Sequence, residues 1–170
     1  MTRPRLAVLV SGGGTTLENF AARIADGRLD AEIAGVVASK HGIGALARCA
    51  RLGLPVTVVP WPGKAAALEF DDAVTRAVES TGADLVCMGG FLRLWRFPDR
   101  WSGRVLNIHP GLLPRFGGPG MYGHHVHAAV LAAGVPESGC TVHVATHAYD
   151  QGPVVVERRV TLDVQADTRF

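Results

Sequence analysis

The sequence has little charge, and this scarcity excludes several classes of protein. Charged residues make up 19% of the 170 residues, the formal net charge is only +2, and no block of five or six like charges occurs. A basic patch that binds nucleic acid or a membrane surface is therefore not indicated. No apolar run approaches the roughly 18 residues that a membrane-spanning helix needs. We therefore expect neither a nucleic-acid nor a membrane partner.

Cysteine is also scarce. Cys49, Cys87 and Cys140 are widely spaced and flanked by apolar residues. An odd number of such cysteines fits buried free thiols in a reducing compartment better than it fits disulfides or metal binding. The apolar run near the start, residues 6–10, is too short for a signal peptide. We therefore expect a cytoplasmic protein.

The sequence does contain 48% hydrophobic residues, enough for the core of one domain over residues 1–170. In its first half, short apolar runs alternate with amphipathic segments. We predict strands at 6–10, 33–38, 56–59 and 85–88, and helices at 16–25, 43–51 and 65–80. Apolar strands separated by helices imply an α/β fold, a doubly wound and mostly parallel sheet with helices on both faces.

The second half has a different pattern. A strand is predicted at 104–108, an irregular segment rich in Pro and Gly at 110–123, a helix at 126–133, and strands at 141–145 and 154–160. We find no internal repeat or linker. In doubly wound sheets, ligands bind at the carboxyl ends of the strands, near the point where strand order reverses.

A glycine-rich loop, Ser11 to Thr16, joins the first strand to the first helix. Its glycines allow the backbone to approach a ligand, and the unpaired N–H groups of a helix N-terminus suit a phosphate. Thr15 and Glu18 have the spacing of a capping box. A tight turn without a ligand explains the loop equally well.

Two familiar nucleotide sites do not fit this loop. It lacks the Lys followed by Ser or Thr of a Walker loop. A dinucleotide site requires a third Gly where this chain has Leu17, and an acidic residue where the second strand ends in Ser39 and Lys40. We therefore do not expect NAD.

Asn107 and His109 lie two positions apart at the end of a predicted strand, so their side chains point to the same side. An amide that can bind an oxyanion beside an imidazole that can move a proton suits acyl-group chemistry. Such a site needs a carboxylate to orient or charge the histidine, and Asp150 in a later loop is a candidate. A hydrogen-bonded structural histidine is the alternative interpretation of His109.

The other histidines allow more than one interpretation. His143 alternates with valines on a strand, so it either faces the same cleft as His109 or lies hydrogen-bonded in the core. His124, His125 and His127 form a dense group without a partnering Asp or Cys at ligand spacing. We favour a cluster at a helix start beside the substrate cleft over a zinc site, and we predict no metal.

Three motifs in the second half resemble those of the folate-dependent formyltransferases: Leu106-Asn107-Ile108-His109-Pro110, Leu112-Leu113-Pro114 and Asp150-Gln151-Gly152-Pro153. The loop from Ser11 to Leu17 and the turn from Gly90 to Arg93 are similar as well, so the resemblance runs from the first strand to the end of the chain. Within the family, the chain looks most like the branch that formylates glycinamide ribonucleotide in purine biosynthesis. The segment Phe116 to Gly123 looks like a longer loop found in some bacterial members.

The resemblance implies a fold, two substrates and a set of site residues. The co-substrate would be 10-formyltetrahydrofolate and the acceptor glycinamide ribonucleotide, handled by a monomer or homodimer. The implied catalytic residues are Asn107, His109 and Asp150; the implied ribonucleotide-binding residues are Gly14, Thr15 and Thr16; and the implied folate-binding residues are Leu92, Arg93, Leu94, Trp95, Asn107, Thr146 and Asp150.

The chain departs from the family pattern at three places. Ala67 stands where the family usually has a folate-contacting Arg, with Lys64 nearby. The Phe116–Gly123 loop changes the wall of the nucleotide site. The chain also stops at Phe170, so we expect the family's C-terminal helix to be missing.

Two alternatives remain from the sequence. One is a formyltetrahydrofolate hydrolase, although that branch usually carries an additional N-terminal domain, which we do not expect before a strand near residue 6. The other is a truncated, non-catalytic protein that binds folate or a nucleotide. We do not expect transfer to methionyl-tRNA, because the branch that formylates it usually has a further C-terminal domain that we do not expect here.

Overall fold

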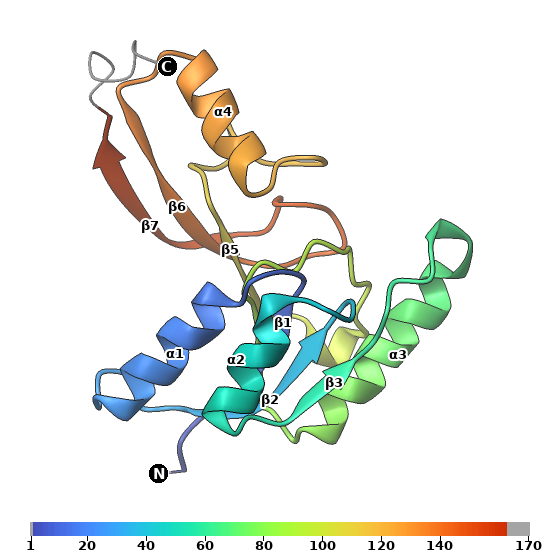
Figure 1. Cartoon of the computed structure of the whole chain (residues 1–170). Helices are drawn as coiled ribbons and strands as arrows, with labels where there is room; N and C mark the ends of the chain where they lie inside the picture. Colours follow the sequence, from blue (N-terminus) through green and yellow to red (C-terminus); the bar gives the residue numbers. More distant parts are fainter. Residues whose placement is uncertain (1, 163–170) are drawn as a thin grey trace. The chain divides into compact units, whose positions relative to one another are not determined.

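The computed structural model describes residues 2–162. The chain forms two compact units, Met1–Leu106 and Asn107–Phe170, called here the N-terminal and C-terminal units. Its strands are hydrogen-bonded in the order β3-β2-β1-β4-β5-β6-β7, and β5 (Val105–His109) begins in one unit and ends in the other (Figure 1). The prediction of one domain over residues 1–170 stays a prediction.

The N-terminal unit alternates strands and helices as the sequence predicts. Its elements are β1 (Arg5–Val10), α1 (Thr15–Ala25), β2 (Glu32–Ala38), α2 (Gly44–Leu52), β3 (Val56–Val58), the short 3-10 turn η1 (Lys64–Ala66), α3 (Ala67–Ser80), β4 (Leu85–Met88) and the turn η2 (Asp99–Trp101). β1 pairs in parallel with both β2 and β4, and β2 with β3. The predicted doubly wound α/β fold is therefore confirmed.

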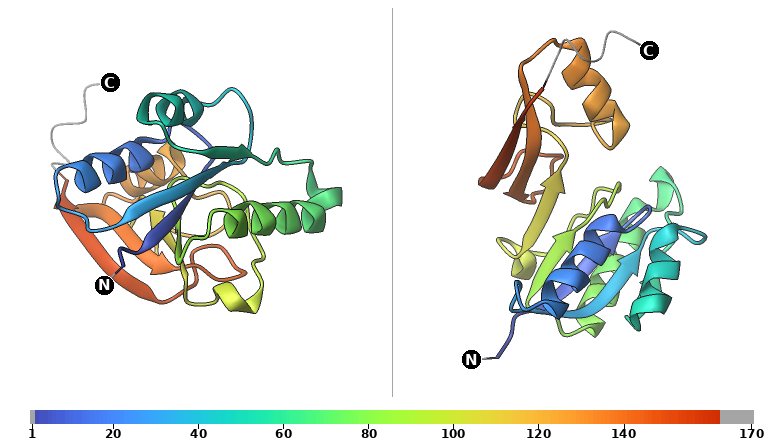
Figure 2. Two further views of the ribbon diagram at one scale, coloured as in Figure 1. Left: turned by 90° about the horizontal axis from the view of Figure 1, so that it is seen from below. Right: turned by 60° about the vertical axis from the view of Figure 1, so that its left-hand side comes forward.

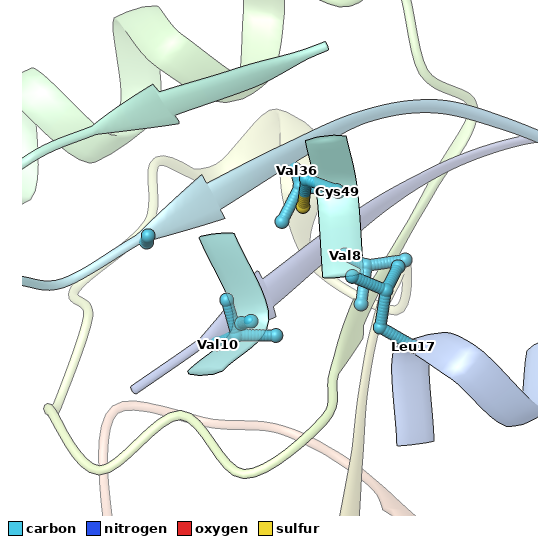
Figure 3. Packing of buried hydrophobic residues seen from close by; sticks show 7 residues of the cluster. Val8, Val10, Leu17, Val36 and Cys49 are labelled. Carbon is cyan, nitrogen blue, oxygen red and sulfur yellow. The ribbon is translucent and has the colours of Figure 1, made fainter. Parts of the chain in front are cut away.

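The helices of this unit cover both faces of its sheet (Figure 2). α1 and α2 lie on one face, where Leu17 and Cys49 pack with alternate residues of the strands, including Val8 and Val36 (Figure 3). α3 packs against β2 and contributes buried apolar side chains such as Phe70. Because both faces are covered, β1 is continuously apolar from Leu6 to Val10 rather than alternating, as buried parallel strands usually are.

The carboxyl ends of three strands of this unit are held together by one buried serine. Ser11, which follows β1, shares a hydrogen bond of 2.6 Å with the Ser39 hydroxyl after β2. Its backbone N–H donates to the Gly90 carbonyl, and its hydroxyl accepts from the Leu92 N–H at 3.0 Å, both after β4. The glycine-rich loop and the Gly90–Arg93 turn are thus adjacent at the point where strand order reverses between β1 and β4.

The predicted capping box at the start of α1 is wrong. Gly14, not Thr15, is the N-cap residue, with φ of 82° in the left-handed region that favours glycine, and no side chain caps the helix. Glu18 turns instead toward α2, where Arg48 donates to it at 2.8 Å and Arg51 forms an ion pair with it. The hydrogen bond from Arg48 lowers the pKa of Glu18. The Glu18 carboxylate therefore connects α1 to α2 and does not cap the N-terminus of α1.

The C-terminal unit contains the end of β5, the helix α4 (His124–Ala132) and the strands β6 (Glu137–Val144) and β7 (Val154–Thr161). β6 and β7 pair antiparallel. Residues between β5 and α4 form turns and irregular structure, as predicted. Phe116 in this segment packs with Val126 and Val130 of α4 in a small hydrophobic cluster.

Two further predictions from composition bear on the described residues. Within residues 2–162, no helix is both long and apolar enough to span a membrane. All three cysteines are free: Cys49 is buried, whereas Cys87 and Cys140 are half-buried. Burial raises the pKa of Cys87 to about 11, so this thiol is not a nucleophile at neutral pH. The expected C-terminal truncation concerns residues that lie outside the described part of the chain.

The packing of α1 on the sheet gives a stability prediction. Leu17 is 0% exposed, so Leu17→Ala should lower the free energy of unfolding by about 2–5 kcal/mol through lost burial and a cavity. The matched control is Leu68→Ala on α3, where the side chain is 70% exposed and the change should stay within about 0.5 kcal/mol. Urea denaturation of both variants measures the difference, and equal effects would contradict this packing.

Candidate active site

The end of β5 positions the first two candidate residues. Asn107 and His109 have side chains on the same side of the strand because they are two positions apart. The His109 side chain is buried, with only 3% of its surface exposed, and Asn107 is half-buried. Pro110 follows directly and ends the strand, so the chain turns away beyond His109.

Asp150 stands in the loop of residues 145–153 that connects β6 and β7. Its φ of 55° is a left-handed conformation that is uncommon for a residue other than glycine. Gly152 comes so close to the preceding strand that a Cβ there would lie 1.7 Å from the Val144 carbonyl oxygen. The Val144 N–H also donates to the Pro153 carbonyl at 2.9 Å, which closes the turn. The Asp-Gln-Gly-Pro motif therefore fixes the place of the Asp150 carboxylate.

The structure brings the three predicted catalytic side chains together around this carboxylate. Asp150 Oδ2 lies 3.5 Å from His109 Nδ1. Asn107 Nδ2 donates to Asp150 Oδ1 at 3.3 Å. The Asp150 side chain is only 8% exposed, so these contacts form in a largely buried setting.

A fourth side chain, for which the sequence allowed two interpretations, belongs to the same group. His143 on β6 is buried, and its Nε2 lies 3.4 Å from Asp150 Oδ1 and 3.0 Å from Asn107 Nδ2. The alternation of His143 with valines indicated that it could face His109, but nothing in the sequence showed that it shares the carboxylate. We call Asn107, His109, His143 and Asp150 the carboxylate cluster.

A backbone N–H also holds Asp150. Gly118, in the loop between β5 and α4, donates to Asp150 Oδ2 at 3.0 Å. Burial alone would raise the pKa of Asp150, but the interactions of its carboxylate with His143, Gly118 and His109 outweigh burial and lower the pKa. The carboxylate is therefore ionised at neutral pH.

Each ring nitrogen of His109 has an oxygen atom nearby. Its Nδ1 faces Asp150 Oδ2, and its Nε2 lies 2.6 Å from the Phe116 carbonyl oxygen. Only the doubly protonated ring can donate to both, because a neutral imidazole carries a single N–H. The arrangement therefore favours an imidazolium whose charge is balanced by Asp150.

The predicted phosphate site is a helix N-terminus in the N-terminal unit. Gly14 is buried against Ala45, whereas Thr15 and Thr16 begin α1 and are at least partly exposed. Arg48 donates to the Gly13 carbonyl at 2.6 Å and thereby braces the loop. No side-chain hydrogen bond caps α1, and the unpaired first-turn N–H groups of such a helix can bind an anion.

The predicted folate segment is divided between surface and core. Leu92 and Arg93 are exposed and Leu94 is half-buried. Trp95 is only 1% exposed, and its indole N–H donates to Thr75 Oγ1 at 3.0 Å, so its ring serves the core and is not available for stacking on a ligand. Thr146 is half-buried and hydrogen-bonds with the Ala148 backbone.

The histidine group lies at the start of α4, as predicted. His124 begins the helix, and its ring centroid lies 4.1 Å from that of His125. Among residues 2–162, no group of three or more His, Cys, Asp or Glu side chains is placed to hold a metal ion.

Comparison with known proteins identifies the family. Residues 4–169 match the family model described as Formyl transferase. The chain therefore belongs to the formyl transferase family, as the resemblance of its motifs predicted.

Its relatives include single enzymes and parts of longer ones. The chain is 32% identical over 174 residues to the phosphoribosylglycinamide formyltransferase of Haemophilus influenzae. The alignment covers 97% of this chain and 80% of that protein. It is 37% identical over 162 residues to the trifunctional purine biosynthetic protein adenosine-3 of Gallus gallus, where it covers only 16% of the relative's length. The crystal structure of glycinamide ribonucleotide transformylase 1 from Symbiobacterium toebii superimposes with a TM-score of 0.80 at 33% identity, covering 94% of this chain and 74% of that one.

The ionised state of Asp150 gives a prediction about stability. The lowered pKa means that folding favours the carboxylate, so its contribution is present above the unfolded pKa of about 3.9 and is lost as the pH falls through the lower folded value. The stability difference between the wild type and Asp150→Asn should therefore shrink as the pH falls below about 4. Urea denaturation of both proteins between pH 3 and pH 6 measures it, with the exposed Asp72→Asn as control. A difference that grows toward low pH would contradict the assignment.

Proposed function

We propose that the chain transfers a formyl group from 10-formyltetrahydrofolate to the amine of glycinamide ribonucleotide in purine biosynthesis. Two of its relatives carry the names phosphoribosylglycinamide formyltransferase and glycinamide ribonucleotide transformylase 1. The observation that carries the proposal is the convergence of Asn107, His109 and Asp150 in one buried cluster. An amide donor, an imidazole and a carboxylate are the groups that formyl transfer needs.

In the proposed reaction, the amine nitrogen of the ribonucleotide attacks the formyl carbon and a new C–N bond forms. The formyl oxygen gains negative charge, which N–H groups of Asn107 and protonated His109 stabilise. The bond between the formyl carbon and N10 of the folate then breaks, and N10 accepts a proton as the amine loses one. The ionised Asp150 holds His109 in its charged form and in a fixed orientation.

The Phe116 carbonyl occupies the position where His109 would meet the formyl group. It accepts from His109 Nε2 at 2.6 Å, so this nitrogen has no donor capacity left for a substrate. The substrate oxygen would therefore replace the Phe116 carbonyl, and the loop Phe116–Gly123 would shift on binding. This loop is the part of the chain that the sequence set apart as an unusual, longer variant.

The two substrates are assigned to separate segments. The phosphate of the ribonucleotide is assigned to the uncapped N-terminus of α1, through backbone N–H groups near Gly14, Thr15 and Thr16. The folate is assigned to the exposed Leu92 and Arg93, to Leu94, and to the segment Thr146–Asp150. Trp95 keeps only a backbone role in this assignment, because its ring is buried.

The setting and assembly of the protein also belong to the proposal. The proposed location is the cytoplasm, with which the three free thiols are compatible. The proposed form is a monomer or homodimer, and the proposed chemistry uses no metal.

The catalytic assignment predicts the outcome of two substitutions. His109→Ala and Asp150→Asn should each lower kcat for formyl transfer by roughly 10²-fold or more, the usual loss when acid–base help is removed. Initial rates of tetrahydrofolate formation from 10-formyltetrahydrofolate and glycinamide ribonucleotide measure this effect. His41→Ala and Asp72→Asn are matched controls, since both side chains are exposed and belong to the other unit.

A reaction without the amine distinguishes the competing activities. Formyl release that is equally fast without glycinamide ribonucleotide would indicate a hydrolase. Folate binding without turnover would indicate a non-catalytic protein. A near-normal rate in either catalytic variant would remove that residue from the mechanism.

A further inference from the structure

Asp150 is one carboxylate between two buried imidazoles. Its Oδ2 lies 3.5 Å from His109 Nδ1, and its Oδ1 lies 3.4 Å from His143 Nε2. Both histidine side chains are at most 3% exposed, so water screens them little. Two positive rings beside a single negative charge would repel each other in such a setting. The cluster therefore favours one charged and one neutral histidine.

The hydrogen-bond partners show which ring is neutral. His109 has an oxygen near each nitrogen, the Phe116 carbonyl at 2.6 Å and Asp150 Oδ2 at 3.5 Å, and thus suits the charged form. His143 Nδ1 faces the Val144 carbonyl at 3.1 Å and so carries a proton. Its Nε2 instead faces a donor, because Asn107 Nδ2 lies 3.0 Å away. A neutral ring with its proton on Nδ1 satisfies both contacts, and it leaves the longer approach of Nε2 to Asp150 Oδ1, at 3.4 Å, without a hydrogen bond.

We propose that His143 is a positioning residue that fixes the orientation of the Asn107 amide. Its unprotonated Nε2 accepts one N–H of Asn107, which keeps the amide nitrogen, rather than the oxygen, on the side of Asp150. The second N–H contacts Asp150 Oδ1 at 3.3 Å, and it would donate to the formyl oxygen when that oxygen takes the place of Asp150 as its acceptor. This inference rests on the proposed formyl transfer.

The orientation matters because the two ends of an amide have opposite effects on an oxyanion. With the nitrogen forward, Asn107 donates a hydrogen bond to the developing negative charge. With the amide turned by half a rotation, its carbonyl oxygen would face that charge and repel it. In this structure no other histidine ring contacts the Asn107 amide within the described residues. Removing His143 therefore leaves the amide with only its longer contact to Asp150, at 3.3 Å, so its orientation is held less firmly.

A double-mutant cycle tests this role. His143→Ala should lower kcat about 10- to 10²-fold and change KM for 10-formyltetrahydrofolate less than about 3-fold, because an oriented donor acts mainly on the transition state. In the Asn107→Ala background, the same substitution should have almost no further effect, since His143 acts through Asn107. His143→Gln, which offers an acceptor oxygen, should recover part of the rate. His41→Ala serves as the exposed histidine control.

The opposite outcome of the cycle is well defined. Equal losses in the presence and absence of Asn107 would show that His143 supports the fold or acts independently, and would overturn the proposal. A larger loss in His143→Gln than in His143→Ala would also overturn it.

A ring-nitrogen measurement keeps this test independent of activity and of the folding of any variant. In the ligand-free wild type, the ¹⁵N shifts of His143 should show a protonated Nδ1 and an unprotonated Nε2 at neutral pH. A protonated Nε2 would overturn the positioning role, because it could not accept from Asn107. If the wild type does not transfer formyl groups but Nε2 is unprotonated, the proposed function fails while the assigned amide orientation stands.

Discussion

The carboxylate of Asp150 is the interaction on which the candidate active site depends. It contacts Asn107, His109 and His143 and accepts from the Gly118 backbone. A buried charge with few partners is costly, whereas one with several donors is stable. The same contacts that keep Asp150 ionised therefore set the protonation and orientation of the side chains around it. Removing the charge would therefore weaken the contacts of all four of these groups with their common partner.

The backbone around Asp150 explains why this carboxylate can be so closely surrounded. The residue adopts a left-handed conformation, and Gly152 allows the chain to pass against Val144 without a clash. Strained residues of this kind persist where the surrounding structure holds them, and they are frequent at functional sites. The β6–β7 pairing on either side provides that support. The strained backbone of Asp150 thus serves to place its own carboxylate.

Much of the fold follows from the sequence pattern. Apolar strands, amphipathic helices and the ending of α2 at the left-handed Gly53 are local properties, and they predict the doubly wound arrangement of the N-terminal unit. The capping box at Thr15 failed because Glu18 has stronger partners in Arg48 and Arg51, thirty or more positions away. A local motif contains no information about such distant side chains, which compete with the helix N-terminus for Glu18.

The site could be predicted only in part, for the same reason. Strand periodicity placed Asn107 and His109 on one side, but Asp150 was chosen through the family resemblance. The Gly118 N–H and the Phe116 carbonyl are backbone groups, so the residue types at these positions do not predict their contacts. His143 could be placed on a strand, whereas its contact with Asn107 depends on how β5 and β6 bring the two side chains together. The buried ring of Trp95 likewise depends on α3.

The central claim is that Asp150 keeps His109 in its charged form, and the ring nitrogens of His109 test it most directly. Long-range ¹H–¹⁵N spectra of the ligand-free protein near pH 6 distinguish a doubly protonated ring from either neutral tautomer. The account predicts protons on both His109 nitrogens in the wild type and loss of one of them in Asp150→Asn. A His109 ring that is neutral in the wild type, or equally charged in both proteins, would contradict it.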